Sequence, residues 1–169
     1  EKMNLWIGTS GFQYTEWKGT FYPEDLSTAK MLPYYAARLT TTEINYTFHR
    51  IPSAKTIEGW YKATPERFKF SLKAPQKITH FSKLRDCTDT LRYFYQTVSA
   101  LGSKLGPVLF QLPPSLKKDA TVLAGFLEEI PSGMRTAFEF RHASWFDEEI
   151  FDFLHACNVT LCRADMQTL

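Results

Sequence analysis

The sequence predicts an α/β fold in which parallel strands alternate with helices in a single domain covering residues 1–169. Short stretches of alternating apolar and polar residues recur along the chain, and each is followed by apolar residues at helical spacing. Connections this short favour parallel strands joined by right-handed crossovers. A composition of 44% hydrophobic and 22% charged residues is typical of a globular domain.

Charge and cysteine content exclude several classes of protein. A net charge of +2 is too small to favour a nucleic acid or an anionic membrane surface as partner. The three cysteines form no CxxC pair, which disfavours a disulfide framework or a thiolate zinc site. No run approaches the ~18 apolar residues of a membrane span. We therefore expect a cytoplasmic protein that does not bind membranes.

Six strands are predicted, each from an alternating or short apolar stretch. They cover residues 5–11, 42–46, 68–73, 107–112, 136–141 and 159–165. Residues 68–73 alternate most strictly. Pro113 and Pro114 end the fourth strand because proline cannot donate to the ladder.

Five helices are predicted between these strands. One begins near Met31, with Pro33 in its first turn, and Ser53 and Asp119 serve as N-caps of two others. Asp147 places negative charge at the start of the last helix. The apolar stripes are Met31, Leu32, Tyr35 and Leu39; Ile57, Trp60 and Tyr61; Leu91, Phe94, Tyr95 and Val98; Val122, Leu123, Phe126 and Ile130; and Ile150, Phe151, Leu154 and Cys157.

The spacing of the strands favours a barrel over an open sheet. Each strand–helix unit takes about 31 residues, and eight such units need roughly 250 residues, the usual size of a (β/α)8 TIM-type barrel. A doubly wound open sheet also accommodates six strands. However, inward-facing polar residues occur on five different strands: Glu43 and Asn45; Lys69, Ser71 and Lys73; Gln111; Glu139 and Arg141; and Arg163 and Asp165. We therefore expect a TIM-type barrel that is C-terminally truncated, with exposed sheet edges that allow self-association.

The stretch 138–145 is the centre of the predicted site. Glu139 and Arg141 alternate with two phenylalanines, and His142 and Trp145 follow at the end of the strand. An ionisable pair on a buried strand either takes part in chemistry or fixes packing, and the sequence leaves both interpretations open.

Several motifs, taken together, resemble the YecE-like family. They are Gly8–Phe12 with Tyr14 and Trp17, Glu43–Asn45 with Phe48, Phe70–Ser71 with Lys73, Ile78–His80, Gln111–Ser115 and Glu139–Trp145. The resemblance implies a TIM-type barrel and a cytoplasmic protein but no established reaction. Members of the family typically carry about two further strand–helix units.

The candidate site residues follow from the rule that barrel chemistry occurs at the C-terminal ends of strands. The predicted catalytic residues are Glu139, Arg141, His142 and Asp165. The predicted substrate-binding residues are Thr9, Ser10, Tyr14, Trp17, Glu43, Asn45, Lys73, His80, Gln111 and Trp145. No HxH or HExxH spacing identifies a metal, no GxGxxG identifies a phosphate loop, and the cofactor remains undetermined.

These residues predict an enzyme that uses acid–base chemistry on a small polar or anionic molecule, such as a sugar, a nucleoside or a phosphorylated metabolite. A metal-assisted nucleic-acid-processing barrel and a non-catalytic binding or scaffold protein are the alternatives.

Overall fold

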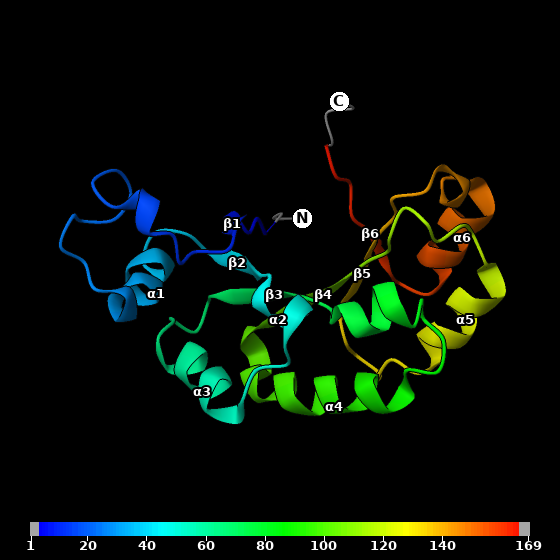
Figure 1. Ribbon diagram of the computed structural model, residues 1–169, viewed down its shortest axis with the longest axis horizontal. Helices are drawn as coiled ribbons and strands as arrows, with labels where there is room; N and C mark the ends of the chain where they lie inside the picture. Colours follow the sequence, from blue (N-terminus) through cyan, green and yellow to red (C-terminus); the bar gives the residue numbers. More distant parts are fainter. Residues whose placement is uncertain (1–3, 166–169) are drawn as a thin grey trace.

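The computed structural model describes residues 4–165 and contains one six-stranded parallel sheet (Figure 1). The strands are β1 (Gly8–Ser10), β2 (Thr41–Ile44), β3 (Lys69–Lys73), β4 (Leu105–Gln111), β5 (Thr136–Glu139) and β6 (Thr160–Leu161). Their spatial order is the order of the chain, and every neighbouring pair is parallel. The predicted alternation of strands and helices is confirmed.

Five helices connect consecutive strands, and a sixth is a short extra turn. They are α1 (Thr28–Ala36), α3 (Ala54–Lys62), α4 (Thr88–Val98), α5 (Ala120–Glu128), α6 (Glu148–Ala156) and the short α2 (Tyr46–His49). Single turns occur at Thr15–Trp17, Lys77–Phe81, Ser99–Lys104 and Ala143–Trp145.

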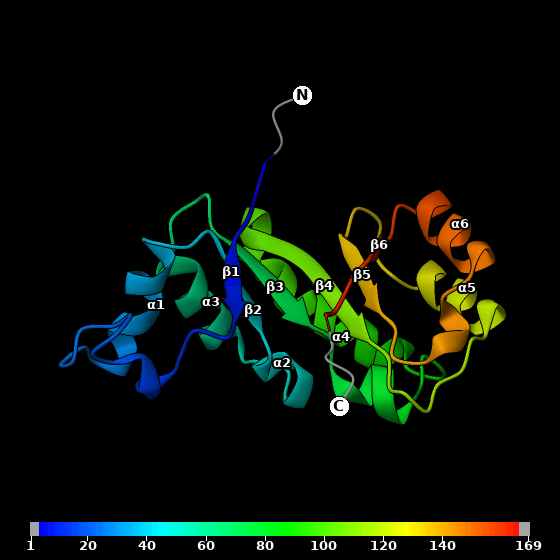
Figure 2. The ribbon, with the colours of Figure 1, turned by 90° about the horizontal axis from the view of Figure 1, so that it is seen from above.

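The helices cover one side of the sheet. Figure 1 shows α3 and α4 beneath a curved sheet, with α1 at one end and α5 and α6 at the other, while no described helix covers the concave side. Figure 2 shows β1 and β6 at opposite edges. A doubly wound fold has helices on both faces and a reversal of strand order, and the part of the chain that the structure describes has neither. Between residues 4 and 165 the sheet stays open, because β1 and β6 do not pair.

Phenylalanines fill the space between the sheet and the helices. Phe70, Phe110 and Phe138 are fully buried on the side facing the helices. The rings of Phe110 and Phe138 stack with centroids 5.3 Å apart, and Phe126 of α5 meets Phe110 edge-on at 5.1 Å. Burial of each side chain stabilises the fold by roughly 2–3 kcal/mol. The alternation therefore directs the aromatic half of each strand toward the helices.

The predicted caps form as expected. Ser53 Oγ accepts a hydrogen bond from the backbone N–H of Thr56 at 3.2 Å, and Asp119 Oδ1 accepts one from Val122 at 3.0 Å. Asp147 is itself the cap of α6, because its Oδ1 accepts from the backbone of Ile150 at 3.0 Å.

Several predicted boundaries and buried faces are wrong. β2 ends at Ile44, since the chain turns into α2, and β6 ends at Leu161, which leaves Arg163 and Asp165 exposed beyond it. α1 begins at Thr28, so Pro33 lies in its second turn. Cys157 is exposed rather than buried because α6 ends one residue before it.

Tyr61 is also exposed, and a buried lysine explains its position. Lys104 is 3% exposed, and its Nζ donates to the carbonyl oxygens of Tyr61 and Thr64, both at 2.7 Å. The ammonium lies 4.0 Å from the centroid of the Tyr61 ring. The ring thus covers a buried cation that the sequence pattern does not reveal.

Candidate functional site

Polar side chains on the concave side of the sheet form a first network at the ends of β1 and β2. Ser10 Oγ donates to Glu43 Oε1 at 3.0 Å, and Asn45 Nδ2 donates to Ser10 Oγ at 2.6 Å. Ser10 and Glu43 are neighbours in the strand register. Three predicted binding residues therefore meet at one edge of the site.

A second network lies at the ends of β4 and β5. Gln111 Nε2 donates to Glu139 Oε1 at 3.1 Å, and Arg141 Nε donates to the same oxygen. Glu139 is 7% exposed, whereas the Arg141 side chain is 26% exposed. The carboxylate is thus held by two donors at the C-terminal end of its strand.

Lys73 and His80 both contact one aromatic ring, that of Phe48. Lys73 Nζ at the end of β3 is 4.6 Å from the ring centroid of Phe48 in α2, and the His80 ring meets Phe48 edge-on at 5.1 Å. His80 Nδ1 is 2.8 Å from the Thr79 hydroxyl. Burial, the charge of Lys73 and the charge of Arg141 all lower the pKa of His80. We call Lys73, His80 and Arg141 the cation cluster, because the positive charges of Lys73 and Arg141 both act on the imidazole of His80.

An aromatic cavity of about 460 Å³ adjoins the first network. Its lining residues are Gly11, Phe12, Gln13, Tyr14, Ile44, Asn45, Tyr46, Thr56 and Trp60. The Tyr14 hydroxyl donates to the Ser10 carbonyl at 2.6 Å, and its ring lies 4.7 Å from that of Trp17. Trp17 therefore supports the wall of the cavity from behind.

Cys162, which the sequence analysis did not include in the site, follows β6, and its backbone N–H donates to the Phe138 carbonyl at 2.8 Å. Burial and the charges of Glu139 and Glu43 raise the pKa of its thiol, an effect that Arg141 opposes. The thiol thus lies within electrostatic reach of both carboxylates and is held in its neutral form. The only signal in the sequence is its position in the predicted last strand.

Other predicted site residues have structural contacts. The Thr9 hydroxyl lies 2.8 Å from the Tyr35 hydroxyl and donates to the Gly11 carbonyl, so it faces α1. His142 Nδ1 accepts from the Ser144 backbone at 3.1 Å and caps the turn Ala143–Trp145. Asp165 is exposed beyond β6.

Trp145 belongs to the core rather than to the mouth of the sheet. It is 1% exposed and stacks on Phe140 with ring centroids 4.7 Å apart. Its indole N–H donates to the Leu116 carbonyl at 2.8 Å. These contacts leave no face of the indole for a ligand, so we remove Trp145 from the candidate binding residues.

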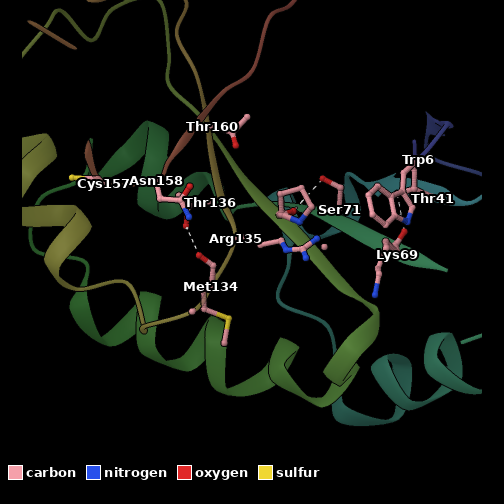
Figure 3. A pocket seen from close by; sticks show the side chains of 13 residues that line it. Trp6, Thr41, Lys69, Ser71, Met134, Arg135, Thr136, Cys157, Asn158 and Thr160 are labelled. Carbon is pink, nitrogen blue, oxygen red and sulfur yellow. Dashed lines mark hydrogen bonds between the residues drawn. The ribbon is translucent and has the colours of Figure 1, made fainter. Parts of the chain in front are cut away.

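A larger cavity of about 660 Å³ lies at the opposite end of the strands (Figure 3). Trp6, Thr41, Lys69 and Arg135 are among its lining residues, which lie near the N-terminal ends of the strands. In TIM-type barrels the catalytic groups occur at the C-terminal ends of the strands. The cavity lies where the described sheet is open, and we do not assign it a catalytic role.

Two further observations concern the described residues. Among residues 4–165 no group of three or more His, Cys, Asp and Glu side chains is arranged to hold a metal ion. In the same part of the chain no helix combines the length and apolar character needed to cross a membrane.

The family described as "Protein of unknown function DUF72" matches residues 6–168. The chain belongs to this family. The resemblance to the YecE-like family is thereby confirmed, since the chain is 29% identical over 113 residues to the UPF0759 protein YecE of Escherichia coli K12. That match covers 66% of this chain and 42% of YecE. The UPF0759 protein YunF of Bacillus subtilis is 27% identical over 156 residues, which cover 88% of this chain and 54% of YunF. The chain thus spans about half the length of these curated relatives.

Solved structures of DUF72 proteins share the fold. The protein from Thermotoga maritima superposes with a TM-score of 0.81 and 32% identity, over 92% of this chain and 63% of that one. A protein from Enterococcus faecalis superposes with a TM-score of 0.72 and 20% identity, over 90% of this chain and 57% of that one. The family carries no established activity in its description, so function must be argued from the site.

Proposed function

We propose that this protein is an enzyme that applies acid–base chemistry to a small, polar, anionic substrate at the C-terminal ends of its strands. The cation cluster is the observation that carries the proposal. In this cluster Lys73 and His80 both contact the ring of Phe48, and Arg141, which follows β5, lies within electrostatic range of His80.

Each member of the cluster has a distinct role in this proposal. Lys73 and Arg141 hold the anionic group of the substrate, because charged N–H donors at one end of the sheet attract a phosphate or carboxylate and Glu139 offsets only one of the two positive charges. The lowered pKa of His80 keeps its imidazole neutral near pH 7, so the ring can accept a proton. Glu139 fixes Arg141 through its Nε and is itself held by Gln111.

We also propose that the curved sheet is part of a TIM-type barrel. Six parallel strands in consecutive order, with helices on the convex side, correspond to successive units of such a barrel. In such a barrel, the end of the strands that carries both polar networks and the cation cluster is the end where barrel enzymes react.

The anion site can be tested by measuring the melting temperature with ribose 5-phosphate and with ribose, its uncharged counterpart. We expect ribose 5-phosphate, and not ribose, to raise the melting temperature, because a ligand bound only to the native state stabilises it. Lys73→Met and Arg141→Met should each reduce the shift. Arg92→Met removes one positive charge from the exposed face of α4 and should leave it unchanged. Binding that does not depend on Lys73 or Arg141 would overturn the proposal.

Hydrogen–deuterium exchange into the substrate in D2O tests whether His80 acts as a base. If His80 takes a proton from the carbon next to the substrate carbonyl, a deuteron returns to that carbon, and the lost proton signal is visible by NMR. His80→Gln should stop this exchange while ribose 5-phosphate still binds. Binding of ribose 5-phosphate without any exchange would identify a binding protein rather than an enzyme.

A further inference from the structure

The aromatic cavity has no role in the chemistry described above, yet it opens beside the same strand ends. We propose that it binds the planar ring of a nucleoside monophosphate whose phosphate is held by the cation cluster. This inference rests on the anion site of the proposed function and specifies a class of ligand that this site takes.

Four aromatic rings line the cavity, those of Phe12, Tyr14, Tyr46 and Trp60. Tyr14 and Tyr46 are 37% and 47% exposed, so each ring keeps apolar surface that a ligand can cover. The hydroxyl of Tyr14 is fixed on the Ser10 carbonyl, and Trp60 stacks on Phe70 with centroids 5.9 Å apart. Partly exposed rings held in fixed positions form a platform on which a flat base can stack.

Polar groups at the edge of the cavity suit a heterocycle better than a hydrocarbon ring. Gln13, Asn45 and Thr56 lie among the lining residues. Asn45 Nδ2 donates to Ser10, while among the described residues no donor bonds to its Oδ1. Side-chain amides pair with the donor and acceptor edges of nucleobases. The edge of the cavity can thus recognise a ring that carries exocyclic polar groups.

The short helix α2 contributes a residue to both subsites. Tyr46 lines the cavity, and Phe48, two residues later, contacts both Lys73 and His80. Tyr46 and Phe48 belong to the same single turn of helix, so the ring subsite and the anion subsite adjoin different sides of one four-residue segment.

Thr47 anchors this helix to the sheet. Its side chain is fully buried, and its hydroxyl lies 2.6 Å from the Lys73 carbonyl and 3.0 Å from the Ile44 carbonyl. The ring subsite and the anion subsite are therefore held on one rigid support. The cavity volume of about 460 Å³ is in the range of small-molecule sites.

Isothermal titration with adenosine 5′-monophosphate, adenosine and ribose 5-phosphate tests the inference. We expect the nucleotide to bind about tenfold more tightly than ribose 5-phosphate, as stacking of one base provides. Tyr46→Ala and, independently, Trp60→Leu should remove this difference and leave the affinity for ribose 5-phosphate nearly unchanged. Tyr93→Ala, at an exposed tyrosine on the outer helix α4, is the matched control and should change neither affinity.

The outcomes separate the two proposals. Equal affinities for the nucleotide and ribose 5-phosphate, both lowered by Lys73→Met, would overturn the ring site and support the anion site. Adenosine that binds as tightly as the nucleotide, without any effect of Lys73→Met, would overturn the anion site and support the ring site. Absence of binding by all three compounds would overturn both.

Discussion

The two faces of the sheet are built from the same strands but have opposite character. The convex face carries Phe70, Phe110 and Phe138, all fully buried under the helices. The concave face carries Glu139 and Gln111, the nearest strand neighbours of two of these phenylalanines. Successive side chains of a strand point to opposite faces. One set of alternate residues therefore packs against the helices, and the other set belongs to the candidate site.

Burial has a different cost on the two faces. Burial of the phenylalanine side chains stabilises the folded state, because their apolar surface is removed from water. Glu139 is nearly as buried, but its carboxylate needs donors, and Gln111 and Arg141 provide them. The comparison predicts that substitutions on the convex face lower stability and that substitutions on the concave face lower function.

Phe138→Ala should have the largest effect on stability. Removing a fully buried ring that stacks on Phe110 leaves a cavity, and we expect a loss of about 3–5 kcal/mol in the free energy of unfolding. Urea denaturation measures this loss. Tyr93→Ala, which truncates an exposed ring, should change stability by no more than about 0.5 kcal/mol. A loss below about 1 kcal/mol for Phe138→Ala would show that the convex face is not the main source of stability.

Glu139→Gln, one residue along the same strand, should cost less stability and more function. The amide keeps the shape and one acceptor oxygen, and partial exposure of Arg141 screens its charge, so we expect less than about 2 kcal/mol. The exchange rate with ribose 5-phosphate should fall about tenfold or more, since Arg141 loses the carboxylate that positions it.

The free energy of unfolding and the exchange rate of Glu139→Gln together show whether the Glu139–Arg141 pair serves function or packing. A stability loss of about 3 kcal/mol or more with an unchanged exchange rate would mean that the Glu139–Arg141 pair only fixes packing. Glu128→Gln removes an exposed carboxylate from α5 and should affect neither quantity.

Ser10→Ala should have a smaller effect on stability. The hydroxyl connects Asn45 to Glu43 in an exposed part of the site, so water replaces the lost hydrogen bonds and the expected cost is within about 1 kcal/mol. If Asn45 is positioned by Ser10, the affinity for adenosine 5′-monophosphate should fall while that for ribose 5-phosphate stays the same. An equal decrease for both ligands would contradict this role.

Local patterns account for what the sequence predicted well. Alternation located β3 and the inward direction of Glu43 and Glu139, and two caps fixed the starts of α3 and α5. These features depend on residues close together in the chain, which a sequence displays directly.

The missed features depend on contacts between distant segments. The Trp145 indole is buried because the Leu116 carbonyl, 29 residues away, accepts its N–H. Lys104 is buried because the end of α3, 40 residues away, supplies the Thr64 carbonyl. Phe48 connects Lys73 with His80 only once α2 has docked on the end of β3. No local pattern encodes these partners.

The smallest expected effect concerns the pH dependence of stability. Burial and the charges of Lys73 and Arg141 lower the folded-state pKa of His80 below the value of about 6.5 expected for the unfolded chain. Between these two pKa values the unfolded state binds more protons than the folded state, so the free energy of unfolding decreases as the pH falls through this window. Above about pH 6.5 the contribution of His80 is constant.

His80→Gln should therefore flatten the pH dependence of unfolding below about pH 6.5, as measured by urea denaturation at a series of pH values. Lys73→Met should act in the same direction, because the loss of one repelling charge raises the pKa of His80 toward its ordinary value. NMR titration of the imidazole protons measures that pKa directly. His155→Gln, at an exposed position on α6, is the control and should leave the pKa of His80 unchanged. A His80 that titrates at or above about 6.5 would show that the cation cluster does not form, and the concave face would then lack the group assigned as its base.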